Sequence, residues 1–151
     1  MRPCFGDKIV RIGSSVLCAI IAVSCASGQF APLPKVMTAR PTEVVVMRPR
    51  KTVGGMISIQ MTVDRHKVVA LASGDCIKIR LDPGPHLVGA RCYKWPMGWY
   101  EDAVQIDAEP GGRHWVSVAL TMMSNAPEVV ALDEQAASRN LADCHWLDAT
   151  Q

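Results

Sequence analysis

The chain of 151 residues lacks the sequence motifs of the common enzyme classes. No serine stands in a G-x-S-x-G setting, and neither a phosphate-binding loop nor a dinucleotide fingerprint is present. No two of its four histidines have the i, i+2 or i, i+4 spacing of a local metal site. The sequence therefore predicts a non-catalytic protein without a bound metal or cofactor.

The histidines and acidic residues that are present have ordinary structural interpretations. His86 begins an expected strand in phase with Val88, which favours a partly buried ring with a backbone partner, and His66 falls in an expected turn. Glycoside hydrolysis needs two carboxylates at a defined separation in a cleft. We interpret the acidic residues near strand ends as a solvated face instead. They are Glu101, Asp102, Asp107 and Glu109.

The chain also lacks an apolar run of about 20 residues, the length that a transmembrane helix requires. A shorter run, VLCAIIAVSCA at 16–26, follows a basic segment that contains Arg2, Lys8 and Arg11. A positively charged start before a short apolar run is typical of a signal peptide. We therefore expect export, with residues 1–24 removed as the signal peptide.

The end of the apolar run resembles the lipobox of bacterial lipoproteins. The residues that carry the resemblance are AVSC, ending at Cys25. The resemblance implies cleavage before Cys25 and lipidation of that cysteine, palmitate included. Ala26, in place of the aspartate that retains such proteins in the inner membrane, implies an outer-membrane lipoprotein that faces the periplasm. The alternative is cleavage after a small residue such as Ala26, which gives a soluble periplasmic protein.

No excess of positive charge remains after such a cleavage. Residues 1–24 contain three basic residues and one acidic residue, so the rest of the chain has a net charge of zero. Nucleic-acid binding requires a concentrated basic patch. The sequence therefore predicts no nucleic-acid partner. The expected partners are the membrane, through the lipid anchor, and an unidentified envelope protein.

Alternating apolar residues predict a series of short strands after a flexible tether at 25–43, which contains three prolines. The folded domain is expected at 44–151, and the turns DPGP and EPGG are expected to close β-hairpins. Pro49 suggests that the first strand ends at a sheet edge. Asp133 is placed to cap a helix over 134–142. The predicted fold class is all-β with a short C-terminal helix, a small antiparallel β-sandwich of about seven or eight strands.

Three cysteines, Cys76, Cys92 and Cys144, remain in an oxidising compartment, where one disulfide and one thiol are expected. If 76–81 and 86–93 pair as a hairpin, Cys92 continues the apolar face and Cys76 points the opposite way. Opposite faces cannot bring two Cβ atoms together for a disulfide. Cys144 shares the inward face of the expected helix with Ala137 and Leu141, so the predicted disulfide is Cys92–Cys144.

Half of the chain's eight aromatic residues fall within eight positions around Pro96 and Gly98. They are Tyr93, Trp95, Trp99 and Tyr100. An exposed loop of this composition would be a binding loop, with rings that stack on a sugar or anchor a partner. The other interpretation, which we favour, is that these rings close the open end of the sandwich core.

The stretch VDRHKVVALASGDCIKIRLDPGPHLVGA at 63–90 resembles the repeated hairpin of PEGA-type domains. It is also similar to a family of bacterial lipoproteins of unknown function that share this PEGA-like plan. The matching positions are Gly74, Ile79, Leu81, Pro83, Gly84, His86 and Val88. The resemblance extends over about 44–142, including the ending from Asp133 to Leu141, and its motifs concern turns rather than catalysis. It implies a fold and says little of activity.

These features together predict a non-catalytic lipoprotein of the cell envelope, a membrane-tethered structural or protein-interaction module. The alternative is a soluble periplasmic binding module that takes a glycan or peptide on the aromatic loop.

Overall fold

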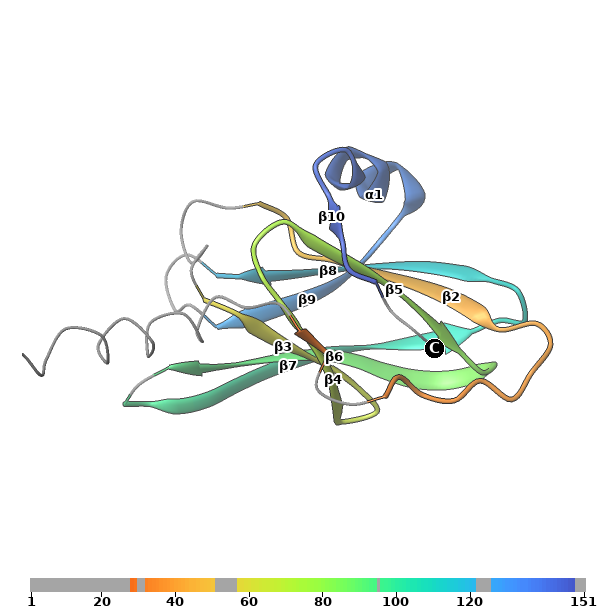
Figure 1. Ribbon diagram of the computed structural model, residues 1–151, viewed down its shortest axis with the longest axis horizontal. Coiled ribbons are helices and arrows are strands. Elements are labelled where there is room, and N and C mark those ends of the chain that lie inside the picture. The colour runs from red at the N-terminus through yellow and green to blue at the C-terminus, as the bar shows by residue number, and fades with distance from the viewer. Residues whose placement is uncertain (1–27, 30–31, 51–56, 95, 122–125, 149–151) are drawn as a thin grey trace, which may run out of the picture.

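The computed structural model describes residues 28–29, 32–50, 57–94, 96–121 and 126–148. In this part of the chain two five-stranded sheets lie face to face, and a single helix covers the outer side of one of them (Figure 1). The expected all-β fold with a short C-terminal helix is confirmed. The expected signal peptide and Cys25 lie outside the described residues.

Each of the two sheets combines strands from separate parts of the chain, and the chain crosses between the sheets several times. The first, sheet A, has the order β1 (Gly28–Gln29), β4 (His66–Leu71), β3 (Ile59–Val63), β6 (Gly84–Lys94), β7 (Gly98–Ala108). The second, sheet B, has the order β10 (His145–Trp146), β5 (Asp75–Leu81), β2 (Thr42–Met47), β8 (Arg113–Leu120), β9 (Pro127–Leu132). Sheet A is antiparallel throughout. In sheet B the pairs β2–β8 and β10–β5 are parallel, so the sandwich is not wholly antiparallel as expected.

The core lies between the sheets and is built from the inward residues of nearly every strand. Strand β3 shows the pattern most clearly, because Ile59, Met61 and Val63 are buried and the residues between them are not. Strand β2 differs, since all of its hydrophobic residues are buried on both faces. Its position at the centre of sheet B explains this, because strands covered on both sides become continuous apolar runs. The expected edge position near Pro49 is therefore wrong.

The two expected hairpins across DPGP and EPGG are also wrong. Strand β5 pairs with β2 in sheet B, whereas β6 pairs with β3 and β7 in sheet A. In the same way β7 belongs to sheet A and β8 to sheet B. The expected apolar faces of the two strands are confirmed, because Ile79 of β5 and Val88 of β6 both enter the core. They meet across the sandwich rather than along one sheet, so each of these turns carries the chain from one sheet to the other.

The described part of the expected tether is folded onto the domain. Leu33 belongs to the main core and is only 7% exposed. The backbone N–H groups of Met37 and Thr38 donate to the carboxylate of Asp82 at 2.9 and 3.0 Å. Gly28 and Gln29 pair with β4 as a short edge strand. The flexible tether predicted over 25–43 is therefore wrong for these residues, because burial of Leu33 and pairing of β1 stabilise them.

A buried arginine joins the two sheets at one end of the core. Arg48, directly after β2, is only 4% exposed. Its guanidinium donates to the backbone carbonyls of Leu71, at 2.6 Å, and of Ile57, both on the sheet A side. Burial lowers the pKa of Arg48, and the nearby carboxylate of Asp75 opposes this shift. A buried charge is tolerated only when it is well hydrogen-bonded, so Arg48 must keep these bonds. Because Arg48 follows β2 of sheet B and the carbonyls lie on the sheet A side, the bonds hold the two sheets together.

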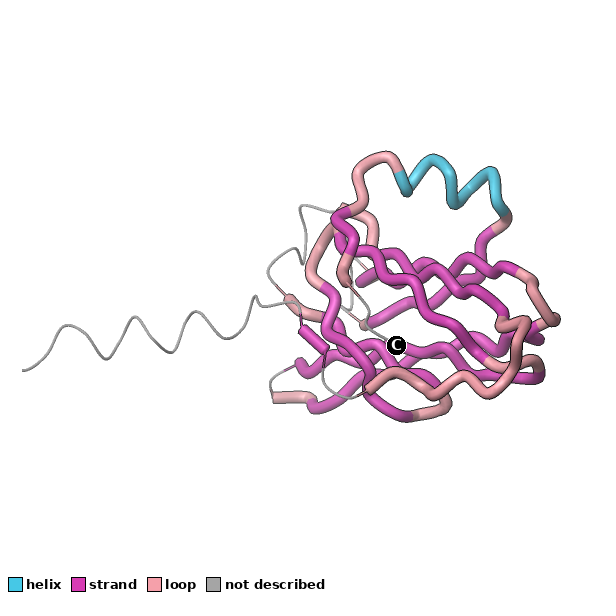
Figure 2. The backbone as a smooth tube through the Cα atoms, turned by 45° about the vertical axis from the view of Figure 1, so that its right-hand side comes forward, coloured by secondary structure: helices cyan, strands magenta, loops and turns pink. Residues whose placement is uncertain are grey.

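Helix α1 (Glu134–Leu141) lies across the outer face of sheet B, as Figure 2 shows from a second direction. Asp133 caps it as expected, because its carboxylate accepts the N–H of Ala136 at 2.6 Å. Ala137 is fully buried against Val45 and Met47 of β2, where the helix forms a second small core. After the helix the chain returns to sheet B as β10, which extends along β5.

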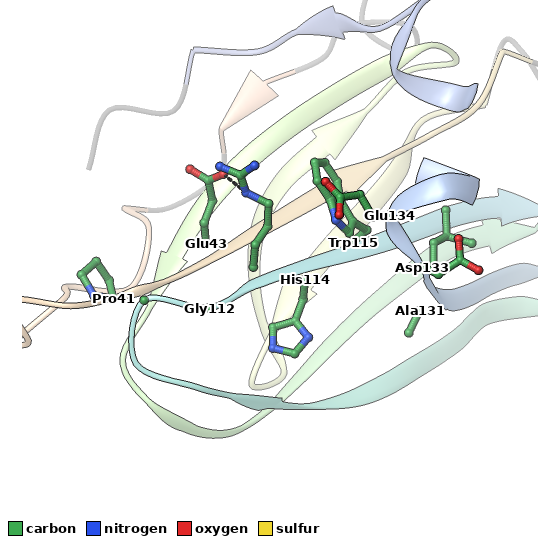
Figure 3. Close-up of a pocket in the computed structure, with 11 residues that line it drawn as sticks. Pro41, Glu43, Gly112, His114, Trp115, Ala131, Asp133 and Glu134 are labelled. Carbon is green, nitrogen blue, oxygen red and sulfur yellow. Dashed lines mark ion pairs between the residues drawn. The ribbon is translucent and has the colours of Figure 1, made fainter. Parts of the chain in front are cut away.

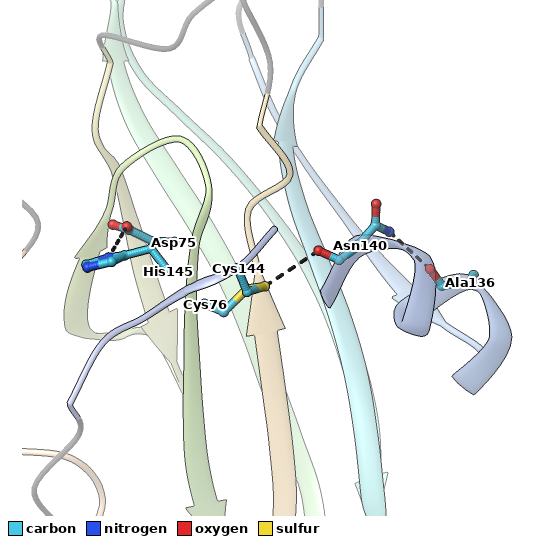
Figure 4. The surroundings of a disulfide bond; sticks show 6 residues. All are labelled: Asp75, Cys76, Ala136, Asn140, Cys144 and His145. Atoms are coloured by element: carbon cyan, nitrogen blue, oxygen red, sulfur yellow. Dashed lines mark hydrogen bonds and ion pairs between the residues drawn. A yellow bond between two sulfur atoms is a disulfide. The ribbon is translucent and has the colours of Figure 1, made fainter. Parts of the chain in front are cut away.

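The disulfide joins Cys76 to Cys144, so the predicted Cys92–Cys144 bond is wrong (Figure 4). Cys76 points outward from sheet B toward the helix, and the two Cα atoms lie 5.6 Å apart, an ordinary disulfide separation. Cys92 points into the main core from sheet A, so sheet B stands between it and Cys144. Cys76 and Cys92 do face opposite ways, as expected. Cys92 keeps its thiol, and burial raises its pKa, with Arg48 and Lys94 opposing.

We expect the double substitution Cys76→Ala/Cys144→Ala to lower the free energy of unfolding by about 4 kcal/mol, because the bond closes a loop of 68 residues. Urea unfolding with and without reductant measures this, since reductant should destabilise the wild type and leave the double variant unchanged. The control is Cys92→Ala, which removes a buried thiol and should cost about 1 kcal/mol in either condition. Sensitivity of the double variant to reductant, or peptide mapping that links Cys92 to Cys144, would contradict the assignment.

Candidate functional site

The hairpin formed by β6 and β7 presents aromatic and basic side chains on the outer face of sheet A. Tyr93 and Trp99 are cross-strand partners whose rings meet edge to face, 5.4 Å apart, and they are 52% and 46% exposed. The guanidinium of Arg91 lies over the Trp99 ring at 4.1 Å, and the ammonium of Lys67 at 5.6 Å. With Met97, which is 67% exposed, these residues form what we call the aromatic surface.

Of the three aromatic residues of this loop that the structure describes, only Tyr100 takes part in the expected closure of the core. Tyr100 packs against the main core from the inner side of β7. Tyr93 and Trp99 alternate with it and therefore point outward, because successive residues of a strand face opposite sides. Trp95 lies outside the described residues. Among the described residues of the loop, Tyr93 and Trp99 with their basic neighbours are thus exposed to a partner.

Three buried polar atoms at or beside the aromatic surface, two of them on β3 or directly before it and one on β6, have no hydrogen-bond partner among the described residues. They are Ser58 Oγ, Gln60 Oε1 and Arg91 Nε, although another nitrogen of Arg91 pairs with Glu101 at 3.2 Å. Next to them a depression of about 460 Å³ opens along β3, β6 and β7. Gly89 of β6 stands between Thr62 and Ala103, two residues that line this depression, and a Cβ atom there would lie 2.7 Å from the threonine hydroxyl.

A second depression, of about 640 Å³, lies on sheet B near the start of the helix (Figure 3). At its side Glu43 forms ion pairs with Arg113, at 2.8 Å, and with Lys78, at 3.2 Å. The guanidinium of Arg113 is also 5.5 Å from the Trp115 ring. Trp115 itself packs at the edge of the second core. Because the charged groups already pair with one another, this depression presents a polar surface rather than an isolated charge.

His86 lies where the sequence predicted, with both ring nitrogens engaged. Nδ1 is 2.9 Å from a carboxylate oxygen of Asp64, and Nε2 is 2.8 Å from the backbone oxygen of Asp82. Asp64 also accepts the N–H of Leu87 at 2.9 Å. Asp64 and Arg65 form the two-residue β3–β4 turn with φ of 49° and 68°, and the contacts of Asp64 hold that turn against β6. Since neither nitrogen is available to a substrate, the pair has a structural role.

The other candidate residues do not converge on one site. His66 is exposed at the start of β4, and His145 lies 3.2 Å from the carboxylate of Asp75 at the far side of sheet B. The four acidic residues Glu101, Asp102, Asp107 and Glu109 are exposed, as expected of a solvated face. Asp102 also accepts the N–H of Val129 at 2.7 Å, which links the edges of the two sheets. In the described segments no three histidine, cysteine or acidic residues lie close enough to hold a metal ion.

Comparison with known proteins gave no match to a family model or to a curated protein. None of the helices in the described ranges has the length and apolar character needed to cross a bilayer.

The His86–Asp64 pair makes stability depend on pH. Burial opposes charging of His86, but its contacts with Asp64 and Asp82 raise its pKa overall. Burial likewise opposes ionisation of Asp64, but Leu87 and His86 lower its pKa overall. The histidine contribution is therefore complete below about pH 6.5 and is lost as the pH rises through the raised pKa. The aspartate contribution is complete above about pH 3.9 and is lost as the pH falls through the lowered pKa.

The wild type should lose unfolding free energy as the pH rises from about 6 to about 8.5, because His86 then loses its proton. We expect His86→Gln to lack this contribution, so that its stability falls less over the same range. Urea midpoints measured at both pH values test this. His66→Gln is the matched control, because it removes an exposed histidine that neighbours the same turn and leaves the contacts of His86 in place. An equal loss of stability with pH in wild type and His86→Gln would contradict the assigned interaction.

Proposed function

We propose that this chain is a non-catalytic lipoprotein of the cell envelope, a membrane-tethered domain that acts as a structural or protein-interaction module. The observation that carries the proposal is the sequence before the domain, a basic start and a short apolar run that ends in AVSC at Cys25. The first described strand begins at Gly28. Cleavage before Cys25 would therefore leave every described strand and the helix in the mature chain.

The disulfide and the surfaces of the domain support this proposal. A disulfide between Cys76, which is fully buried, and Cys144 is typical of proteins that fold in an oxidising compartment such as the periplasm. For a protein partner, the depression beside Arg113 and Trp115 offers the residue types that dominate interaction surfaces. His86 is engaged at both ring nitrogens, which supports a structural role for this histidine.

We expect Cys25 to carry the lipid. Cells that express the full chain with radioactive palmitate should label the wild type and not Cys25→Ser, and the wild type should sediment with membranes. Cys18→Ser is the matched control, because this cysteine lies in the expected signal peptide and its loss should change neither label nor sedimentation. A soluble, unlabelled wild type, or label that persists in Cys25→Ser, would overturn the anchored lipoprotein.

A second candidate function is a soluble binding module that takes a glycan or peptide on the aromatic surface. It is favoured by the exposure of Tyr93 and Trp99 and by the three unpartnered polar atoms nearby, which a hydroxyl-rich or amide-rich ligand could satisfy if Arg91 moved.

If this second function is correct, Trp99→Ala should lower affinity for soluble envelope glycan fragments or peptides at least about tenfold, because loss of a stacked ring removes a central contact. Titration calorimetry measures this. Trp146→Ala, which removes a ring of nearly equal exposure on sheet B, should leave affinity unchanged. Binding that is absent in the wild type, or unaltered in Trp99→Ala, would exclude this function.

A further inference from the structure

Exposed apolar side chains gather at one place on the domain. Six large hydrophobic residues are exposed within the described ranges, and three of them lie within seven positions at the tip of the β6–β7 hairpin. These are Tyr93, Met97 and Trp99. The tip projects beyond the rest of sheet A at the lower left of Figure 1. Because soluble proteins rarely cluster apolar side chains on a projecting hairpin, this tip has the character of a contact surface.

The pairing register shows that the chain enters the domain from the same end. Gly28 pairs with Ala70, and the row continues through Gln60 and Arg91 to Glu101. The pair Tyr93–Trp99 lies two residues further along β6 and β7. Strand β1 runs away from this pair, since Gln29 pairs with Val69 on the far side of the row. Strand β1 therefore begins at the end of sheet A that carries the hairpin tip and leads away from it.

The separation between the expected anchor and the domain is short. Cys25 precedes Gly28 by three residues, which span at most roughly 10 Å even when fully extended. Strands β1 and β6 are separated by β4 and β3, a lateral distance of about 14 Å at the usual strand spacing. An acyl chain at Cys25 would thus hold this end of sheet A close to the bilayer, with the tip on the same side.

The chemistry of the tip suits a lipid interface. Tyrosine and tryptophan are enriched where a membrane meets water, because their rings are apolar and carry one polar group. Lys67 and Arg91 lie over the Trp99 ring, and Lys94 follows Tyr93, so the rings are accompanied by cations of the kind that anionic lipid headgroups attract. Glu101 pairs with Arg91 and offsets part of this charge.

We propose that the β6–β7 hairpin tip is a second membrane contact, which inserts Tyr93, Met97 and Trp99 into the lipid interface and sets the orientation of the anchored domain. This inference rests on the proposed function, because the lipid at Cys25 supplies the proximity that a few interfacial side chains need for stable contact. In this orientation sheet A meets the membrane at the end that carries the tip, and the polar depression beside Arg113 on sheet B remains accessible to a partner.

The test compares two tryptophans of nearly equal exposure, Trp99 at 46% and Trp146 at 47%. Full chains that retain only one tryptophan, the others replaced by phenylalanine, are purified from membranes. They are then reconstituted into vesicles of phosphatidylethanolamine and phosphatidylglycerol whose acyl chains carry bromine near the headgroup. We expect bromine to quench Trp99 and to leave Trp146 unchanged. Unquenched Trp99, or equal quenching of both, would overturn the proposal.

A second measurement uses the unaltered protein and so does not depend on the folding of the variants. Hydrogen exchange of the wild type should slow in peptides covering 96–99 when vesicles are present, and stay constant in peptides covering 143–147. Palmitate label at Cys25 separates the two claims. A labelled protein with unquenched Trp99 is anchored but lacks the second contact. An unlabelled protein refutes the anchor. Vesicles are then added to it, and quenching of Trp99 supports the hairpin contact, whereas unquenched Trp99 overturns it.

Discussion

The structure depends on the burial of two apolar sheet faces against each other. Each of the long strands contributes alternate residues to the space between the sheets, so Val44 and Ile79 from sheet B meet Met61 and Val88 from sheet A. Apolar burial of this kind is the main favourable term in folding. Burial does not by itself fix the path of the chain, because the chain can bury successive apolar runs by crossing between sheets as well as by turning back within one. Arg48 completes this arrangement, since its guanidinium joins the two sheets through backbone carbonyls.

The outer face of sheet B has its own small core, which explains two features that otherwise look unrelated. The central strand β2 is apolar on both faces because Val45 and Met47 are covered by helix α1. Cys76 points to the same outer face and meets Cys144 at the end of the helix. The disulfide and the pairing of β10 with β5 therefore hold one covering segment in place, and the long loop that the bond closes links the middle of the chain to its end.

Sheet A leaves its outer face open, and its features bear on function. Tyr93 and Trp99 stand on a projecting hairpin, Arg91 and Lys67 lie over the indole ring, and Gly89 leaves no room for a side chain between Thr62 and Ala103. The first strand enters from the hairpin end. In the proposed lipoprotein these two facts have a common consequence, because an anchor close to an amphipathic hairpin restricts how the domain can stand on a membrane.

Local patterns in the sequence determined which residues of β3, β5 and β6 face inward, where the helix lies, and which residue caps it. The inward faces depend on period-two alternation along a strand, and the helix cap depends on Asp133, which accepts the N–H of a residue only three positions later. Both are local features of the sequence. Only the tertiary structure decided which strands pair, that Cys144 meets Cys76, and that Leu33 belongs to the core. The physical reason is that the apolar face of a strand is buried equally well whether the next strand joins the same sheet or the opposing one. DPGP therefore crosses between layers although its flanking residues suit a hairpin, and sheet B separates Cys92 from the helix.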